Sequence, residues 1–507
     1  MSGSAQISNA ESSAVKSAQA IRLPSTVAIG FTGHRNLPDE SKSRADILKF
    51  LQDFKSKTNK TVYGVSSAAA GGDLLFAESC IQLGLPVRIL LPAPKEQFRD
   101  DFDASTWRRA ESLMQAAISV EVIGYGQTKE ERYYECGAET VQQSEILLAL
   151  WDGKPSQGVG GTEEIFEYAK NQGRPVVWIH SVTGEIQHFN QEKESAGDPE
   201  LDFLNRLPDS VAHAAIKTPY DLAHAWFLKI DDNASHAAPE LRRLAAIPIL
   251  CTAGAAICTA AFSFAHNSGA LVGIGAALGL MTSALPSVMK LYSRQIIWTR
   301  IRTATEISRS VLALWRTPGP YEVVGPEIIP ELAGMLASLN YLKISDGADR
   351  GTSLEDFKKA YRKERVADQI EYFSRNAAKS NRKTSQYQLT VTLSVVVGLI
   401  ANALMLLATY WLRGYFGRHS LTGLAFAGTV CFQIATVAGA LLIVNDWHRR
   451  RERYRELHDL LVVWDKQIAS AGTWAIVLRT ATRVERALLA EVIEWRSLIR
   501  NRKMPQK

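Results

Sequence analysis

Short apolar runs alternate with amphipathic segments of helical periodicity between residues 26 and 182. The runs are rich in β-branched residues and almost continuously hydrophobic, and they read TVAIGFTG, TVYGVSS, PVRILLP, VEVIG, EILLALWDG and PVVWIH. Strands of this kind are buried on both faces, and their alternation with helices is typical of a parallel sheet that carries a helical layer on each side. The pattern therefore predicts an α/β domain over 26–182.

The pattern changes beyond residue 240, where long stretches carry no Asp, Glu, Lys or Arg. They lie between Arg243 and Lys290, between Lys383 and Arg413, and between Arg418 and Asp446. Because about 20 apolar residues cross a bilayer core, the first stretch is long enough for two crossings and each of the others for one. We therefore expect an all-α membrane domain with four transmembrane helices in two hairpins, at about 244–264, 270–290, 387–411 and 421–444.

A buried helical hairpin in a large soluble domain is the alternative for the first pair. Its sequence LAAIPILCTAGAAICTAAF is rich in Ala, Gly and Thr and only weakly hydrophobic. The same alternative fits poorly to LTVTLSVVVGLIANALMLLATYWL and LTGLAFAGTVCFQIATVAGALLIV. We therefore interpret both pairs as membrane hairpins.

Basic residues indicate the orientation of the hairpins. Lys and Arg flank each hairpin at its two ends, whereas the turn between its helices is short and carries few basic residues. Since positively charged flanks stay in the cytosol, both hairpins are expected to enter from the cytosolic side and return to it. The expected organisation is a disordered tail over 1–25, a Rossmann-like sheet domain over 26–182, a linker and juxtamembrane helix over 183–240, and the membrane domain over 241–507.

Charge and cysteine content narrow the possible functions. The formal net charge of +6 is too mild to imply nucleic-acid binding, and much of the excess lies beside apolar segments. The five cysteines form no CxxC pair and show no metal-ligand spacing, so we expect no metal site. A reducing, cytosolic setting is expected for the parts outside the membrane.

Three glycine-containing loops follow strands of the predicted sheet. Ligands of open parallel sheets bind beyond the carboxyl ends of the strands, where helix N-termini present free amides. Each loop alone is an ordinary turn, and none has the Walker A or GxGxxG pattern. Together they predict a nucleotide pocket without a resident cofactor. Its candidate residues are Thr32, Gly33, His34, Arg35, Ser67, Gly71, Gly72, Asp73, Asp152, Gly160, Gly161, Thr162, Glu163 and Glu164.

The acidic and aromatic segment APKEQFRDDF, residues 93–102, follows the third predicted strand. A ligand can shift a conformational equilibrium only by binding one state better, so the pocket must include a part that moves. We consider this segment a candidate lid, with an ordinary surface loop as the alternative.

The segments GFTGHRNL, SSAAAGGDLLFAESCIQLGLPVRILLP and ILLALWDGKPSQGVGGTEEIFEYA closely resemble the SLOG superfamily. That superfamily of Rossmann-like nucleotide-binding domains includes the LOG phosphoribohydrolases and DprA. The segments YRKERVADQIEYFSRNAAKSNRK and WTRIRTATEISRSVLALW look like the SLATT family of membrane effector domains. Proteins in which a SLOG sensor is fused to a SLATT membrane module are associated with bacterial conflict systems.

These resemblances imply a sensor for a nucleotide second messenger, such as an ADP-ribose-related molecule or a cyclic nucleotide. They imply an enzyme encoded elsewhere that makes the signal, and a homo-oligomer that perforates or depolarises the bilayer in anti-phage defence. The expected location is the cell (inner) membrane, with the sensor domain, the middle segment and the C-terminus cytoplasmic.

Two other hypotheses remain open. A membrane-tethered LOG-like nucleotide N-glycosidase would use Glu164 to assist the leaving group and Arg35 to hold the phosphate. LOG enzymes, however, carry PGGxGTxxE, and this chain has Ile165 where that motif has its glutamate. We therefore assign no catalytic residue. A constitutive transporter or scaffold is the third hypothesis, although few ionisable residues lie within the predicted spans.

Overall fold

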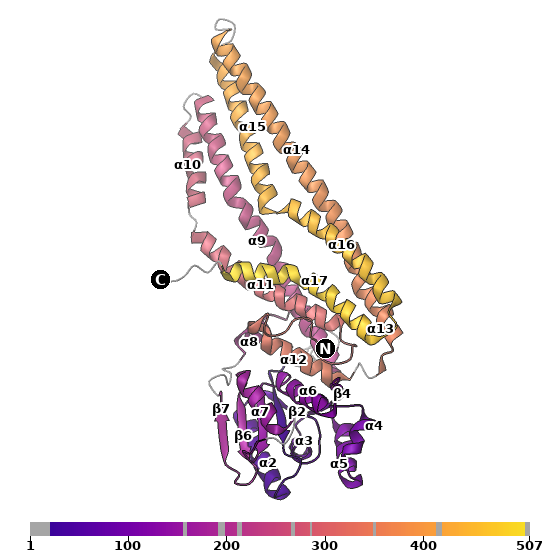
Figure 1. Ribbon diagram of the computed structural model, residues 1–507. Coiled ribbons are helices and arrows are strands. Elements are labelled where there is room, and N and C mark those ends of the chain that lie inside the picture. The colour runs from indigo at the N-terminus through magenta and orange to yellow at the C-terminus, as the bar shows by residue number, and fades with distance from the viewer. Residues whose placement is uncertain are drawn as a thin grey trace, which may run out of the picture. The chain divides into compact units, whose positions relative to one another are not determined.

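The computed structural model of the protein describes residues 21–155, 160–190, 198–209, 215–264, 269–283, 286–347, 351–411 and 418–501. The chain divides into two compact units. The sheet unit comprises Met1–Lys229 and Leu314–Thr352, and the helical unit comprises Ile230–Ala313 and Ser353–Lys507. Figure 1 shows the helices and strands and labels most of them.

The sheet unit contains a seven-stranded sheet in the order β4-β3-β2-β1-β5-β6-β7. Its strands are β1 Thr26–Gly33, β2 Thr61–Ser66, β3 Val87–Leu91, β4 Ser119–Val122, β5 Ile146–Trp151, β6 Val176–His180 and β7 Ile186–Phe189. Neighbouring strands are parallel except β6 and β7, which pair antiparallel. The predicted parallel α/β sheet is therefore confirmed. The added strand β7 was not predicted, because its exposed IQHF sequence lacks a buried apolar run.

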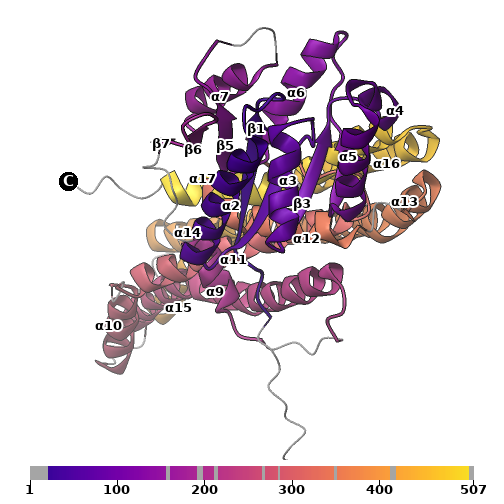
Figure 2. The same ribbon diagram turned by 90° about the horizontal axis from the view of Figure 1, so that it is seen from below.

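Helices cover both faces of this sheet. On one face lie α2 Glu40–Lys57, α3 Gly72–Gln82 and α5 Ala104–Ala116 (Figure 2). They form the larger core with Val27, Ile29 and Phe31 of β1. On the other face, α6 Lys129–Gln142 and α7 Thr162–Asn171 pack against the alternate strand residues. The strand side chains thus alternate between two buried layers, which explains the almost unbroken hydrophobic runs.

Residues 314–352 pack with the sheet, although the sequence placed them inside the range 241–507. This segment contains the 3₁₀ turn η3 Pro330–Leu332 and α12 Ala333–Asp346. The ring of Tyr341 lies 5.2 Å from that of Tyr63 on β2, and buried Lys343 donates a hydrogen bond of 2.7 Å to the carbonyl of Thr317. The short helix α8 Pro199–Asn205 and the first turns of α9 Pro219–Phe264 also belong to this unit.

The helical unit is built from long helices. They are the remainder of α9, α10 Gly269–Ser283, α11 Pro286–Ala313, α13 Leu354–Tyr361, a π-helical turn Arg362–Ala367, α14 Asp368–Tyr410, α15 Arg418–Val444, α16 Trp447–Ser470 and α17 Trp474–Asn501. Helices α14 and α15 run side by side as a hairpin (Figure 1). Gly398 on α14 and Gly428 on α15 let the helices approach closely, because a Cβ atom at Gly398 would lie 3.2 Å from Cys431 Cβ.

Two of the described helical stretches, Leu354–Tyr410 and Leu421–Ser470, are long and apolar enough to cross a membrane. On α14, Leu393, Leu399 and Ile400 are 55%, 57% and 55% exposed. A core helix of a soluble protein would bury such side chains, so their exposure favours contact with lipid. The coarse prediction of a sheet domain followed by a helical region with long apolar helices is confirmed.

Four transmembrane helices stay a prediction, and the described segments of the first pair fall short of a crossing helix. Within the expected span 244–264, the described apolar segment Ile247–Phe262 is shorter than a crossing helix. Residues 265–268 and 284–285, in the turn and in the second expected span, lie outside the described residues. Gly254 on α9 and Gly275 on α10 pack against the partner helix at Leu278 and Cys258 respectively. The two spans at 244–264 and 270–290 therefore stay a prediction.

Candidate functional site

The carboxyl ends of β1 and β5 lie next to each other at the centre of the sheet. From β1 the chain continues outward to β2, β3 and β4, whereas from β5 it continues to β6 on the other side. The loops that follow β1 and β5 therefore diverge, and the crevice between diverging loops is where open α/β sheets bind their ligands. Thr32 and Gly33 end β1 opposite Ala149 and Leu150 of β5.

His34 and Asp152 meet at this switch point. Nε2 of His34 lies 3.0 Å from Oδ1 of Asp152, and the backbone amide of His34 donates to the carbonyl of Leu150 at 3.1 Å. Their side chains are 33% and 21% exposed, so both remain accessible. Burial acts to raise the pKa of Asp152, but hydrogen bonds from His34 and Lys154 outweigh it and lower the pKa to about 2. Asp152 is thus an ionised acceptor.

The loop after β2 approaches the first loop through its backbone. The amide of Gly72 donates to the carbonyl of His34 at 2.9 Å. Gly71 has a φ of +89°, and a Cβ atom there would collide with the carbonyl oxygens of His34 and Arg35. Only glycine fits this position, because it tolerates the positive φ and leaves room for the second chain.

Asp73 lies buried at the start of α3, within this loop. Its Oδ1 accepts hydrogen bonds from the hydroxyls of Ser67 at 2.8 Å and Ser66 at 3.4 Å. Burial raises the pKa of Asp73 to about 6, while those hydroxyls and the charge of Arg35 act in the opposite direction. A carboxyl group with a strongly shifted pKa beside a cleft is a candidate functional group.

The third predicted loop lies against α6. Gly161 is the N-cap of α7, Thr162 is its first residue, and Glu163 and Glu164 occupy its first turn. Oε2 of Glu164 accepts a hydrogen bond of 2.6 Å from the amide of Gly160. Residues 156–159 of this loop lie outside the described residues. The Glu164 carboxylate therefore binds the backbone of the loop that precedes its own helix.

Tyr133 of α6 stands between the first and third loops. The guanidinium carbon of Arg35 lies 4.6 Å from the centre of the Tyr133 ring. A Cβ atom at Gly160 would lie 3.2 Å from Cβ of Tyr133. The structure thus brings the first and second loops and Asp152 together, and α6 connects this group to the start of α7.

Asp101, in the segment considered a candidate lid, gathers with Lys129 and Tyr133 around Arg35, and the sequence predicted neither these two residues nor the contact. Lys129 and the Tyr133 hydroxyl both donate to the carboxylate of Asp101, and an Arg35 nitrogen lies 4.0 Å from its Oδ2. Burial acts to raise the pKa of Asp101, but the bonds from Lys129 and Tyr133 outweigh it and lower the pKa. Burial and the hydrogen bond to Asp101 raise the pKa of Tyr133. No local spacing in the sequence relates position 101 to positions 129 and 133.

Ile165 fills the position where LOG enzymes carry a glutamate. Its side chain is 2% exposed and belongs to the core formed with Phe166 and β5. A Cβ atom at Gly137 of α6 would lie 2.5 Å from Cδ1 of Ile165, so the two helices close tightly over this side chain. Ile165 is therefore a buried core residue that has almost no contact with solvent.

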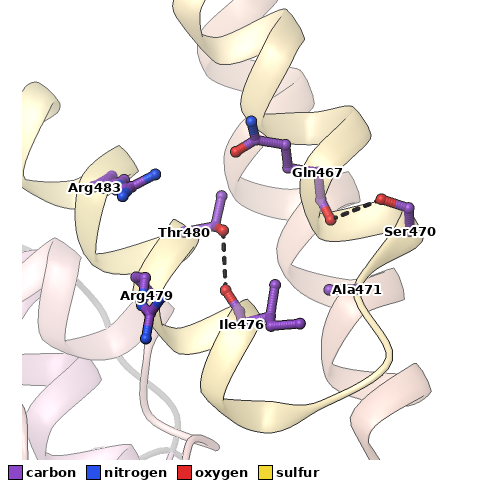
Figure 3. A pocket seen from close by; sticks show the side chains of 7 residues that line it. All are labelled: Gln467, Ser470, Ala471, Ile476, Arg479, Thr480 and Arg483. Atoms are coloured by element: carbon purple, nitrogen blue, oxygen red, sulfur yellow. Dashed lines mark hydrogen bonds between the residues drawn. The ribbon is translucent and has the colours of Figure 1, made fainter.

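A cavity of about 320 Å³ lies in the helical unit, between the end of α16 and the start of α17 (Figure 3). Its lining includes Gln467, Arg479 and Arg483, and it contains no carboxylate. Both arginines are exposed, as they are in a solvated surface groove, so this cavity carries no argument for a site.

Among the described residues, no group of His, Cys, Asp and Glu is arranged to hold a metal ion. A scan against models of known protein families finds no match to this chain, and a search of curated proteins finds none either. The geometry of the sheet edge and the two membrane-length helices therefore carry the functional argument.

Proposed function

We propose that this chain is a bacterial membrane effector that senses a nucleotide-derived second messenger and responds by forming a pore or disrupting the membrane, in anti-phage defence. The observation that carries the proposal is the pairing of His34 with Asp152 at the switch point of the sheet, on a chain that also bears α14 and α15. The first feature supports recognition of a nucleotide, and the second supports action on a bilayer.

The residues at the sheet edge supply the contacts that a nucleotide needs. Ionised Asp152 can accept hydrogen bonds from ribose hydroxyls, and His34 holds this carboxylate through Nε2. Arg35 can donate to phosphate oxygens. The N-terminus of α7 carries the positive end of the helix dipole, which favours a phosphate group. The ligand would be an ADP-ribose-related molecule or a cyclic nucleotide, made by an enzyme encoded elsewhere.

In the membrane part, α14 and α15 form one hairpin, and the segments 244–264 and 270–290 would form the second. The cell (inner) membrane would hold both hairpins, with the sheet unit and the C-terminus on the cytoplasmic side, as the basic flanks favour. The exposed apolar faces of α14 also allow several copies to associate within the bilayer. Ligand binding would change the response by favouring one packing of the helical unit over another.

The alternative of a membrane-tethered nucleotide N-glycosidase has less support. Ile165 is buried where a catalytic glutamate would be needed, and Glu164 is bound to the amide of Gly160. A carboxylate that assists a leaving group must reach the scissile bond. These observations favour retention of the ligand over its cleavage.

The test uses the full-length protein, purified in detergent and incubated with linear and cyclic ADP-ribose species and cyclic oligonucleotides. Mass spectrometry identifies what stays bound and in which chemical form. We expect an intact ligand that is lost in Arg35→Ala and retained in Lys55→Ala, a matched control at the far end of α2. Recovery of a ligand without its base would replace the sensor by the glycosidase, and no retained ligand would overturn nucleotide sensing.

A liposome experiment then tests the response. Vesicles that contain the protein and a trapped dye are mixed with the ligand identified in the first experiment. We expect release of the dye with the wild-type protein and none with Arg35→Ala. Release that is independent of ligand would instead indicate a constitutive channel.

A further inference from the structure

An internal carboxylate occupies a cluster of donors beside the candidate nucleotide pocket. Asp101 ends the short 3₁₀ turn η1 Arg99–Asp101, which belongs to the segment 93–102 after β3. Lys129 and Tyr133 donate to this carboxylate, and Arg35 lies at 4.0 Å from it. The Asp101 side chain is only 10% exposed, although it comes from a surface segment.

The donors come from two elements that the fold holds in place. Lys129 and Tyr133 are one turn apart on α6, so their side chains lie on the same face of that helix. Arg35 follows β1, and its guanidinium stacks over the Tyr133 ring at 4.6 Å. The donor cluster is therefore defined by the rigid sheet and α6, and only its acceptor comes from the loop segment.

The cluster has the composition of a phosphate site. An arginine, a lysine and a phenolic hydroxyl are the donors that bind phosphoryl oxygens in charge-assisted hydrogen bonds. Arg35 and Lys129 are 45% and 50% exposed, so a ligand in the pocket can reach them from solvent. Arg35 is also adjacent in sequence to His34, which places the cluster at the border of the switch-point crevice.

We propose that Asp101 occupies the phosphate subsite of the empty sensor and that a phosphoryl group of the ligand displaces it from Arg35, Lys129 and Tyr133. The proposal rests on the nucleotide-binding function proposed above. It adds which structural change follows when a ligand enters the pocket. A phosphoryl group carries more charge and more acceptor oxygens than the carboxylate, so it competes for the same donors.

Release of Asp101 would move η1, whose two flanking residues are held by aromatic packing. Phe98, immediately before η1, is 1% exposed and packs against Phe102 and Trp107, with ring centres at 4.9 and 6.5 Å. This aromatic cluster anchors the segment to the core while the turn that carries Asp101 swings away. Displacement of one turn is thereby the first structural change that ligand binding produces in the sheet unit.

The first test measures binding of inorganic pyrophosphate to the full-length protein in detergent by calorimetry. Asp101→Asn keeps the shape of the side chain and removes its charge, and we expect it to bind pyrophosphate about tenfold more tightly than the wild type, since one charge-assisted hydrogen bond contributes on the order of a decade. Asp100→Asn removes the same charge from the neighbouring exposed position and should bind as the wild type does. Adding Lys129→Ala to Asp101→Asn should abolish the gain. Equal or weaker binding by Asp101→Asn would overturn the proposal.

The second test measures release of the turn. Arg99 is exposed within η1, so limited digestion with trypsin reports the opening of this turn. We expect saturating pyrophosphate to accelerate cleavage after Arg99 in the wild type, and Asp101→Asn to be cleaved fast without it. Cleavage after Arg99 that responds neither to pyrophosphate nor to Asp101→Asn would contradict displacement.

The outcomes separate this proposal from the function on which it rests. If the nucleotide panel yields no ligand but Asp101→Asn gains pyrophosphate binding, the phosphate subsite stands and nucleotide sensing fails. If a nucleotide binds the wild type and Asp101→Asn with equal affinity, nucleotide sensing stands and displacement of Asp101 fails.

Discussion

His34 Nε2 lies 3.0 Å from Asp152 Oδ1, although 118 positions separate the two residues in the chain. The contact exists because β1 and β5 are neighbours in the sheet and each residue directly follows its strand. A charged acceptor and an imidazole are thereby held at the one edge where helix N-termini also converge.

Replacing either member of the pair should weaken nucleotide binding. For Asp152→Asn and His34→Ala we expect a loss of about tenfold in affinity, because each change removes a hydrogen bond to a charged group. Lys154→Ala is the matched control, since Lys154 is 80% exposed and its ion pair with Asp152 is screened by solvent. Calorimetry with the ligand from the mass-spectrometry panel measures all three. Equal losses in all three variants would show that the pair has no special part in recognition.

Gly71→Ala should destabilise the sheet unit and abolish binding. Its φ of +89° and the carbonyls of His34 and Arg35 leave no room for a methyl group. We expect a loss above about 2 kcal/mol, since strain at positive φ and a steric clash add together. Gly84→Ala is the control, because Gly84 has a φ of +67° and no atom lies within 4 Å of a Cβ there. Thermal unfolding should therefore show a clearly smaller shift for Gly84→Ala than for Gly71→Ala.

Asp73 should make stability fall as the pH rises. Burial raises its folded-state pKa from 3.8 to about 6, so the folded state binds this proton more tightly than the unfolded state does. The contribution of Asp73 is therefore full below pH 3.8 and is lost as the pH rises through about 6. The loss amounts to about 3 kcal/mol, at 1.4 kcal/mol per unit of pKa shift.

The variant Asp73→Asn tests this dependence, because its amide oxygen still accepts from Ser67. Relative to the wild type, it should gain stability between pH 4.5 and pH 7.5, as measured by thermal unfolding at both values. Ser67→Ala removes the 2.8 Å donor to the carboxylate and should move the wild-type transition to higher pH. A constant difference between wild type and Asp73→Asn at the two pH values would contradict the raised pKa.

In the helical unit, a buried ion pair joins the π-helical turn to α17. Arg365 donates to both carboxylate oxygens of Glu485 at 2.9 and 2.7 Å, and the Tyr361 hydroxyl donates to the same group at 2.8 Å. Glu485 is fully buried and Arg365 is 7% exposed. Arg365→Leu or Glu485→Leu should each cost about 3–5 kcal/mol, because either change leaves an uncompensated buried charge.

The double variant Arg365→Leu/Glu485→Leu should recover much of that loss, since it leaves no unpaired charge. Arg375→Ala serves as the control, because its ion pair with Glu371 is largely exposed. Thermal unfolding in detergent measures the set. Additive losses in the double variant would mean that the pair is not coupled.

Cysteine labelling tests the membrane hairpins. Cys431 lies near the middle of α15 and Cys258 lies on α9. In variants that keep one of these cysteines and replace the others by alanine, a membrane-impermeant maleimide should label neither position in intact cells or inverted vesicles. If Cys258 is labelled and Cys431 is not, only the hairpin of α14 and α15 would lie in the membrane.

An introduced cysteine tests the orientation. Ser470→Cys, at the exposed end of α16, should react in inverted vesicles and stay unlabelled in intact cells, because the basic flanks favour a cytoplasmic position. Labelling of Ser470→Cys in intact cells would reverse the proposed orientation.

The edge strand and the added helix show where the sequence was insufficient. Strand β7 reads IQHF and is mostly exposed, so it owes its conformation to pairing with β6 rather than to a buried apolar pattern. Residues 314–352 carry no strand signal and follow a predicted membrane hairpin, yet α12 packs at the sheet through Tyr341 and Tyr63. Both depend on partners distant in the chain.

The candidate site divides in the same way. The glycines and charged residues after β1, β2 and β5 are visible in the sequence, because a loop after a parallel strand must lie at its carboxyl end. The sequence does not show that Asp101, Lys129 and Tyr133 gather around Arg35. These residues come from η1, from α6 and from the loop after β1, and the order of the strands decides whether these three elements meet.

Local periodicity and composition by themselves determined the parallel sheet, the long apolar helices and the loops that can present a ligand site. These features depend on backbone geometry and on the burial of consecutive side chains, which are encoded within short stretches. Only the tertiary structure decided that His34 meets Asp152, that Asp101 occupies the donors of Arg35 and α6, and that Ile165 is part of a core. Such contacts join residues far apart in the chain, and they arise when the order of the strands and the packing of helices bring those residues together.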